Sequence, residues 1–392
     1  MKKLFILITG ITILYSSESR IKSFGNIKDF IIDPSISYLY PSLLTSFPDL
    51  LWVEFTDSSL QNLPYISFCG INLKFNEKIG VFSFIYNYPS YFHPYIVSYP
   101  SKMEKESRGF EILWAKTLND KIDIGIGASF VYRDEKEEDT TLTEVPTLSV
   151  SDIEIMPSIS YKISEIRNLT FSLHFSSNSF YQEYYTPAIE DTIDGKGNSF
   201  YGLNLRYLNK IGEYSNLILG FHFYSYPKKY EESINASEFE QKKDEMNFNI
   251  GYYTEPLENL KIITGINTNY LKIDTTRIIG TEKKKGTLHA FYINGILGGE
   301  ISIGKNFEIR SGLRKSILRS LKDKNYSMDG KEEDIINQEE YNFEIGFSFL
   351  KDGFRFDGVV SKDLLFKGPF LISGKEVGFL TSFSISYNFS LF

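Results

Sequence analysis

The chain has 392 residues, with 42 Lys and Arg against 50 Asp and Glu, 28 Gly, 13 Pro and a single Cys. This composition excludes a collagen-like repeat, a disulfide-stapled scaffold and a disordered chain. A formal net charge of −8 argues against nucleic acid as the main partner, because phosphate binding needs clustered cations. The 33 Phe and 27 Tyr recur at every second position along much of the chain, which is the spacing of β-strands that face an apolar medium.

The N-terminus has the layout of a secretory signal peptide. Two lysines precede an apolar run from Leu4 to Tyr15, and Ser17 and Ser19 supply the small residues of a cleavage site after Ser19. The run is shorter than the roughly 20 residues that a transmembrane helix needs, so a membrane anchor is the weaker alternative. We therefore interpret residues 1–19 as a signal peptide that directs export.

Strict alternation of residue type begins at about residue 50. The clearest example is the stretch 122–133, in which one face is apolar and the other is small or polar. The apolar face holds Ile122, Ile124, Ile126, Ala128, Phe130 and Tyr132, and the other holds Asp123, Gly125, Gly127, Ser129 and Arg133. The two faces need different media, and many such stretches have the length of about 9 to 13 residues with which a tilted strand crosses hydrocarbon. The pattern predicts membrane-spanning strands.

Up to sixteen such stretches can be counted, near residues 50, 65, 80, 110, 125, 157, 171, 204, 220, 249, 265, 294, 311, 345, 357 and 385. The first and the fifteenth are weakly patterned, so fourteen is an equally defensible count. Short turns alternate with longer polar segments that we expect to be outer loops, at residues 134–150, 177–195, 227–243, 274–285 and 322–338. The predicted fold class is all-β: residues 50–392 form an antiparallel transmembrane β-barrel of 14–16 strands.

A soluble, exported β-sandwich also alternates and is the main alternative. Two features argue against it. Tyrosines lie at the ends of the apolar faces, as in an aromatic girdle: Tyr132, Tyr161, Tyr207, Tyr252 and Tyr270. Charges occupy mid-strand positions on the polar faces: Arg206, Glu300, Glu308, Arg310, Arg314, Glu344 and Arg355. Because such charges need water or one another, we expect them to line a lumen.

The C-terminal strand ends in aromatic residues. Phe383, Ile385, Tyr387 and Phe389 share one face, and Phe392 ends the sequence out of phase with them. This strand resembles the terminal signal that the barrel-assembly machinery reads. The resemblance implies the cell outer membrane as the location, with its lipids and the assembly machinery as partners.

Residues 20–49 do not alternate, and they precede the first strand. They contain DPSISYLYPSLL, which resembles the start of the FadL-like family of barrels, a family that includes long-chain fatty acid transporters and the secretion-associated PorV and PorQ proteins. The matching positions are Asp33, Pro34, Tyr40, Pro41 and Ser42, with Tyr40 and Ser42 in place of the Asn and Ala of the family. The resemblance implies that residues 20–49 form a hatch inside the barrel, which the lumen charges hold.

Two aromatic segments are candidates for capturing a ligand, as outer loops do in the fatty acid transporters that the sequence resembles. Their rings are Tyr88, Tyr91, Phe92 and Tyr95 in one segment, and Tyr184 and Tyr185 in the other. Rigid amphipathic rings on a surface loop can bind a hydrophobic or amphipathic small molecule. The alternative is that these rings pack on one another over the barrel mouth.

Residues that carry metal or catalytic chemistry are scattered. His174, His222 and His289 fall on three different strands and His93 lies in an aromatic segment, none with a His or Cys at metal-ligand spacing. No predicted strand carries a Ser and a His with an orienting third group. The glycines at 125 and 127 are expected to make room for lumen side chains or the hatch. We predict no metal, no cofactor and no enzymatic activity.

Three functions remain open. The first, which we favour, is passive uptake of a hydrophobic or amphipathic small molecule through the hatched lumen of a barrel that is favoured to be a monomer. The second is a PorV-like scaffold that binds secreted proteins through its outer loops. The third is a general porin with an open lumen.

Overall fold

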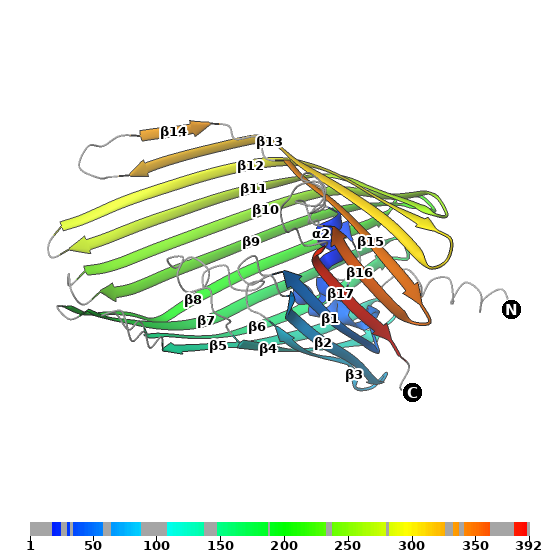
Figure 1. Ribbon diagram of the computed structural model, residues 1–392, viewed down its shortest axis with the longest axis horizontal. Helices are drawn as coiled ribbons and strands as arrows, with labels where there is room; N and C mark the ends of the chain where they lie inside the picture. Colours follow the sequence, from blue (N-terminus) through cyan, green and yellow to red (C-terminus); the bar gives the residue numbers. More distant parts are fainter. Residues whose placement is uncertain are drawn as a thin grey trace, which may run out of the picture.

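The computed structural model describes residues 18–24, 30–31, 34–57, 64–87, 108–136, 147–186, 189–232, 237–279, 282–325, 332–336, 341–360 and 380–389. Within these ranges the strands form one antiparallel sheet that closes on itself (Figure 1). The strands are β1 (Leu50–Asp57), β2 (Pro64–Asn76), β3 (Gly80–Asn87), β4 (Arg108–Asn119), β5 (Ile122–Lys136), β6 (Thr147–Ser164), β7 (Arg167–Thr186), β8 (Ile189–Lys210), β9 (Ser215–Glu232), β10 (Ser237–Leu257), β11 (Leu260–Ile279), β12 (Glu282–Ile303), β13 (Phe307–Asn325), β14 (Glu332–Ile336), β15 (Tyr341–Lys351), β16 (Phe354–Val360) and β17 (Leu380–Asn388). None of the helices in the described ranges has the length and apolar character to cross a membrane.

The ring closes where β1 pairs with β17, from Leu50 opposite Asn388 to Thr56 opposite Ser382. Strands β14 and β15 both pair with β13, at different heights, and so share one position in the ring. The described strands therefore fill sixteen positions, which confirms the predicted transmembrane barrel and the higher of the two strand counts. The weakly patterned first and fifteenth candidates correspond to β1 and β16.

Short turns join the strands at one end of the barrel, which we call the turn end; the opposite end is the rim. Gly304 and Gly353 lie in two of these turns with φ angles of +67° and +85°, which glycine adopts without steric cost. Strand β1 begins at the turn end and β17 finishes there, so the segment before β1 enters the barrel from that side.

Strands β6 to β13 are longer than predicted, with 18 to 22 residues each. The segments 177–195 and 274–285, expected to be loops, are mostly continuations of β7, β8, β11 and β12. A hydrogen-bond ladder needs only a partner strand, so the sheet continues into water where the apolar pattern has ended. The long strands rise past β1–β3 and β15–β17 toward the rim as a one-sided wall (Figure 1).

The two faces of the barrel wall differ in chemistry as predicted. Large apolar side chains on the outer face are between 41% and 50% exposed: Ile126, Ile155, Phe175, Ile250 and Ile266. The lumen face of the wall buries polar residues: Asp123, Ser158, Ser172, Asn204 and Asn249. Tyr132, Tyr161 and Tyr252 are exposed on the outer face, where the sequence placed a girdle.

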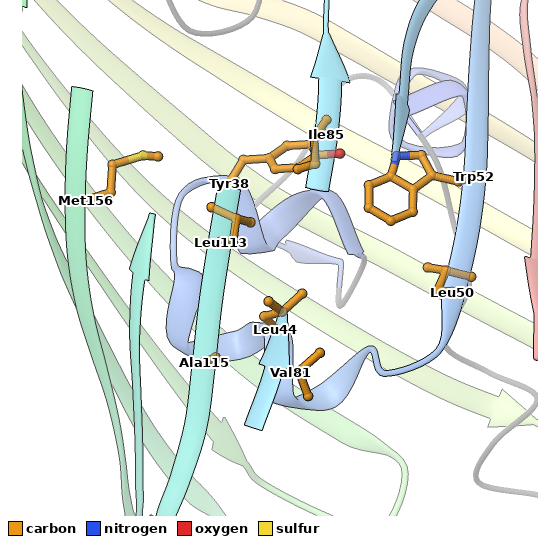
Figure 2. Close-up of a cluster of buried hydrophobic side chains, with 9 residues drawn as sticks. All are labelled: Tyr38, Leu44, Leu50, Trp52, Val81, Ile85, Leu113, Ala115 and Met156. Carbon is orange, nitrogen blue, oxygen red and sulfur yellow. The ribbon is translucent and has the colours of Figure 1, made fainter. Parts of the chain in front are cut away.

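The segment before β1 lies inside the ring, and we call its described residues from Arg20 on, 20–24, 30–31 and 34–49, the plug. It contains the part of α2 (Glu18–Ser23) from Arg20 on and the 3-10 helices η2 (Pro34–Tyr38) and η3 (Pro41–Ser46). Tyr38 and Leu44 of the plug pack with apolar residues of four strands, namely Leu50, Trp52, Val81, Ile85, Leu113, Ala115 and Met156 (Figure 2). This arrangement matches the hatch that the resemblance implied.

The outer face yields a direct test of the membrane register. Replacing Ile266 by Arg places a charge in hydrocarbon and should destabilise the folded barrel by about 2 to 4 kcal/mol. Thr276→Arg is the matched control, because it lies on the same face of β11 but about 25 Å nearer the rim along the barrel axis. Urea unfolding in lipid vesicles measures both variants, and equal losses would contradict the assigned register.

Candidate functional site: a plugged lumen

The plug is anchored near the turn end by a cluster of buried charges. The Arg20 guanidinium forms two bonds to the Glu300 carboxylate, from Nη2 to Oε1 at 2.9 Å and from Nε to Oε2 at 3.1 Å. Lys261 Nζ contacts the same carboxylate at 2.8 Å. Both Arg20 and Glu300 are buried, so this two-bonded pair is shielded from water and fixes the direction of the plug.

Arg310 links the plug to a second set of charges. Its Nε donates to Ser23 Oγ of α2 at 3.0 Å, and its Nη2 lies 2.9 Å from Asp357 Oδ1. Arg355 joins Asp357, at 2.9 Å, to Glu308, at 2.5 Å. Each carboxylate of this charge cluster therefore faces at least one cation, which is the condition under which buried charges are tolerated.

The sequence predicted that lumen charges hold the hatch, and Glu300 and Arg310 do so. The other predicted lumen charges lie elsewhere. Arg206 is buried on β8, whereas Arg314 and Glu344 are half-buried on β13 and β15, nearer the rim than the charge cluster. Glu308 and Arg355 belong to the cluster.

The predicted hatch motif seats the plug against β5 and β6. Tyr40 and Ser42 are buried, and Ser42 Oγ lies 2.8 Å from Ser158 Oγ. A Cβ built on Gly125 would lie 2.4 Å from the Ser42 backbone nitrogen, so only glycine admits the plug backbone this close to β5. The expectation that this glycine makes room for the hatch is confirmed. Pro34 is buried in η2, and Asp33 lies outside the described residues.

A hydrogen-bonded chain of side chains crosses the lumen wall beside the plug. Tyr224 Oη and His222 Nδ1 donate to Asn204 Oδ1, and Asn204 Nδ2 donates to His174 Nε2 at 2.6 Å. The other ring nitrogen of His174, Nδ1, donates to Glu154 Oε1 at 2.7 Å.

Ser172, His174 and Glu154 lie in the order of a catalytic triad, an arrangement that the sequence did not predict because Glu154 comes from the neighbouring strand. Ser172 Oγ is 3.3 Å from His174 Nε2. The Ser172 hydroxyl, however, donates its hydrogen to the Leu39 carbonyl of the plug at 2.5 Å, and Asn204 already occupies the Nε2 lone pair. The trio therefore binds the plug and does not present a serine nucleophile to a base.

Aromatic rings continue from the plug toward the rim along β8 and β9. The Tyr40 ring centroid lies 6.5 Å from that of His222, and His222 stacks on Tyr224 at 6.4 Å. Phe200 then stacks on Tyr226 with centroids 4.8 Å apart. We call Phe200, His222, Tyr224 and Tyr226 the ring ladder. It gives one side of the lumen an aromatic lining outward of the plug.

The strands that follow the ring ladder carry amides and acids on their lumen face. Asn294 donates to Asn267, which donates to Asn249, and so joins β12 to β11 and β10. Asn247 and Asn269 both donate to Glu245 Oε1. The lumen outward of the plug thus combines aromatic faces with hydrogen-bonding groups, which is the chemistry that receives an amphipathic molecule.

The predicted capture residues are not brought together by the described structure. Tyr88, Tyr91, Phe92 and Tyr95 lie outside the described residues. Tyr184 and Tyr185 lie on the rim part of β7 and not in a loop, because β7 and β8 stay paired as far as Thr186 and Ile189. No three His, Cys, Asp or Glu side chains in the described ranges gather as a metal-binding group.

These features define the protein as a transmembrane β-barrel with a polar lumen that holds its own N-terminal segment. No protein-family model and no curated protein sequence matches the chain. Among solved structures, the ferric yersiniabactin uptake receptor FyuA of Yersinia pestis gives a TM-score of 0.50 at 9% identity, over 80% of this chain and 54% of the receptor. The chain spans about half the length of that receptor.

Two further barrels match along most of both chains. A FadL homologue of Pseudomonas aeruginosa aligns over 93% of this chain and 96% of its own, with a TM-score of 0.47 and 11% identity. The toluene transporter TodX of Pseudomonas putida aligns over 94% and 97%, with a TM-score of 0.47 and 9% identity. At these identities the likeness to both barrels is one of fold alone.

The charge cluster predicts that the plug is released when Glu300 is neutralised. Glu300→Gln leaves Arg20, Lys261 and Arg310 facing one another and should destabilise the barrel by about 3 to 5 kcal/mol. Ion conductance in planar bilayers should be low for the wild type and higher for this variant. Glu344→Gln, a lumen carboxylate outside the cluster, is the control. Wild-type conductance and stability in Glu300→Gln would show that the cluster does not hold the plug.

Proposed function

We propose that this protein resides in the outer membrane and lets a small amphipathic or hydrophobic molecule diffuse inward past its N-terminal plug. The observation that carries the proposal is the docking of the plug across the lumen through side chains of opposite walls, at Glu300 and Arg310 on one side and at Ser158 and Ser172 on the other. A plug held in the lumen in this way supports selective entry over the open pore of a general porin.

The ring ladder supports an amphipathic ligand. A molecule that enters from the rim meets the faces of Tyr224 and Tyr226 before it reaches Tyr40 of the plug, and the amides of β10–β12 lie on the adjacent wall. Aromatic faces bind the apolar part of such a molecule, and the amides exchange hydrogen bonds with its polar part.

No enzymatic role is proposed. The Ser172 hydroxyl is buried beneath the plug with its hydrogen on the Leu39 carbonyl, so it faces no substrate. A scaffold that binds secreted proteins remains the alternative function, and the one-sided wall of β6–β13 offers such a partner a surface beyond the short strands.

Native mass spectrometry of the barrel after mild detergent extraction tests the proposal. We expect the wild type to retain a small molecule and Tyr226→Ala to hold it roughly 2- to 12-fold more weakly, since a ring pair contributes about 0.5 to 1.5 kcal/mol. Tyr252→Ala, which removes a ring from the outer face, is the matched control and should leave occupancy unchanged.

Three other outcomes would count against uptake. A silent barrel that retains a protein and no small molecule would favour the scaffold. Large, steady wild-type conductance would favour the general porin. Equal loss of ligand in Tyr226→Ala and Tyr252→Ala would place the molecule outside the lumen.

A further inference from the structure

Three polar side chains form one row across the lumen face of β4, β5 and β6. Glu111 lies opposite Ser129, and Ser129 lies opposite Glu154. Residues directly opposite one another in an antiparallel sheet point to the same side, so the two carboxylates flank the Ser129 hydroxyl. All three are buried, with exposures of 0%, 5% and 2% in that order. We call them the acidic row.

The acidic row contains four oxygens that lack a hydrogen-bond partner among the described residues. They are both carboxylate oxygens of Glu111, Oγ of Ser129 and Oε2 of Glu154. The remaining oxygen, Glu154 Oε1, accepts from His174 Nδ1 at 2.7 Å. The histidine therefore satisfies one of the five polar side-chain oxygens of the row and leaves the other four without a partner among the described residues.

Among the described residues, His174 is the one side chain that pairs with a carboxylate of the acidic row, and it pairs with Glu154 and not with Glu111. Glu154 acts electrostatically on Glu111, and it has the same sign. The charge cluster at the turn end behaves differently, since Glu300 is met there by Arg20 and Lys261. Buried water could satisfy the hydrogen bonds of the row but could not neutralise two buried carboxylates, which requires a cation or a proton.

We propose that Glu111, Ser129 and Glu154 bind a hard divalent cation. Carboxylate and hydroxyl oxygens are the ligands that Ca²⁺ and Mg²⁺ prefer, and two carboxylates match the charge of one such ion. The four free oxygens are fewer than the six to eight that Ca²⁺ takes, so water completes the coordination.

The position of the acidic row gives the ion a structural consequence. One step nearer the turn end, Leu113, Gly127 and Met156 form the next row, and Pro41 of the plug lies against it. An ion bound by Glu111 and Glu154 would link β4 to β6 beside the row of residues on which η3 packs. The cation site does not depend on which molecule the barrel transports.

Equilibrium binding of radioactive Ca²⁺ to the purified, chelator-treated barrel tests the site. The wild type should bind one ion per chain and unfold at a higher temperature with Ca²⁺ than with chelator. Glu111→Gln and Ser129→Ala should each weaken binding, Glu111→Gln by at least about tenfold because it removes a charged ligand. Glu54→Gln, which alters a fully buried carboxylate on β1, should bind Ca²⁺ as the wild type does.

A second readout separates the cation site from a failure to fold. Glu111→Gln removes an unbalanced buried charge, so in chelator it should unfold at a higher temperature than the wild type, and Ca²⁺ should add nothing. Binding that is absent from the folded wild type, or equal in wild type and Glu111→Gln, overturns the proposal. Wild-type stability that depends on pH but not on Ca²⁺ would show that the two carboxylates share a proton, and this result also overturns it.

Discussion

The closed hydrogen-bond ring is the constraint on which the rest of the molecule depends. Once β1 pairs with β17, each strand of the ring has one face toward the outside and one toward the lumen, so a shift of one residue in register would expose the wrong face. The outer face can be uniformly apolar because its medium is uniform. The lumen face buries charges and amides, so it needs a partner that carries its own polar groups. The plug provides that partner.

Several glycines on the lumen face lie where the plug comes closest to the barrel wall. A Cβ at Gly125 would meet the backbone of Ser42, and a Cβ at Gly346 would lie 2.5 Å from the Ser23 side chain. The ring of Phe30 lies over Gly251 and Gly265 in the same way. Glycine in mid-strand weakens a sheet, and in this barrel that cost is offset because the plug approaches the wall at these points. The two sides of the lumen therefore fit one N-terminal segment.

The alternating pattern made the fold predictable. Even β1 and β16 could be located, although their alternation is weak because apolar side chains there also face the lumen, such as Leu50 and Trp52, which pack on the plug. The rim halves of β7 and β8 could not be predicted. Beyond the membrane the hydrogen-bond pairing of the strands continues without apolar alternation, and a polar sequence of this kind is typical of loops. Tyr184 and Tyr185 were placed in a loop for this reason.

The candidate site was predictable only in part. Charge in mid-strand identified Glu300 and Arg310, and the spacing of Pro34 and Pro41 identified the plug. The sequence did not predict the triad-like trio of Glu154, Ser172 and His174, nor the acidic row. Each depends on which residue of one strand lies opposite which residue of the next. The sequence of one strand does not determine its register against the neighbouring strand. The mid-strand glycines were the one feature of the sequence that could indicate which parts of the wall contact the plug.

A cross-link between the plug and the wall tests the central claim most directly. Ser42 and Ser158 have their Oγ atoms 2.8 Å apart, so Ser42→Cys and Ser158→Cys, combined with Cys69→Ala to remove the native thiol, should form a disulfide in the folded barrel on oxidation. The account predicts near-complete cross-linking and low ion conductance in the oxidised protein. If both thiols of the folded barrel instead remained open to a maleimide reagent after oxidation, the N-terminal segment would not occupy the lumen.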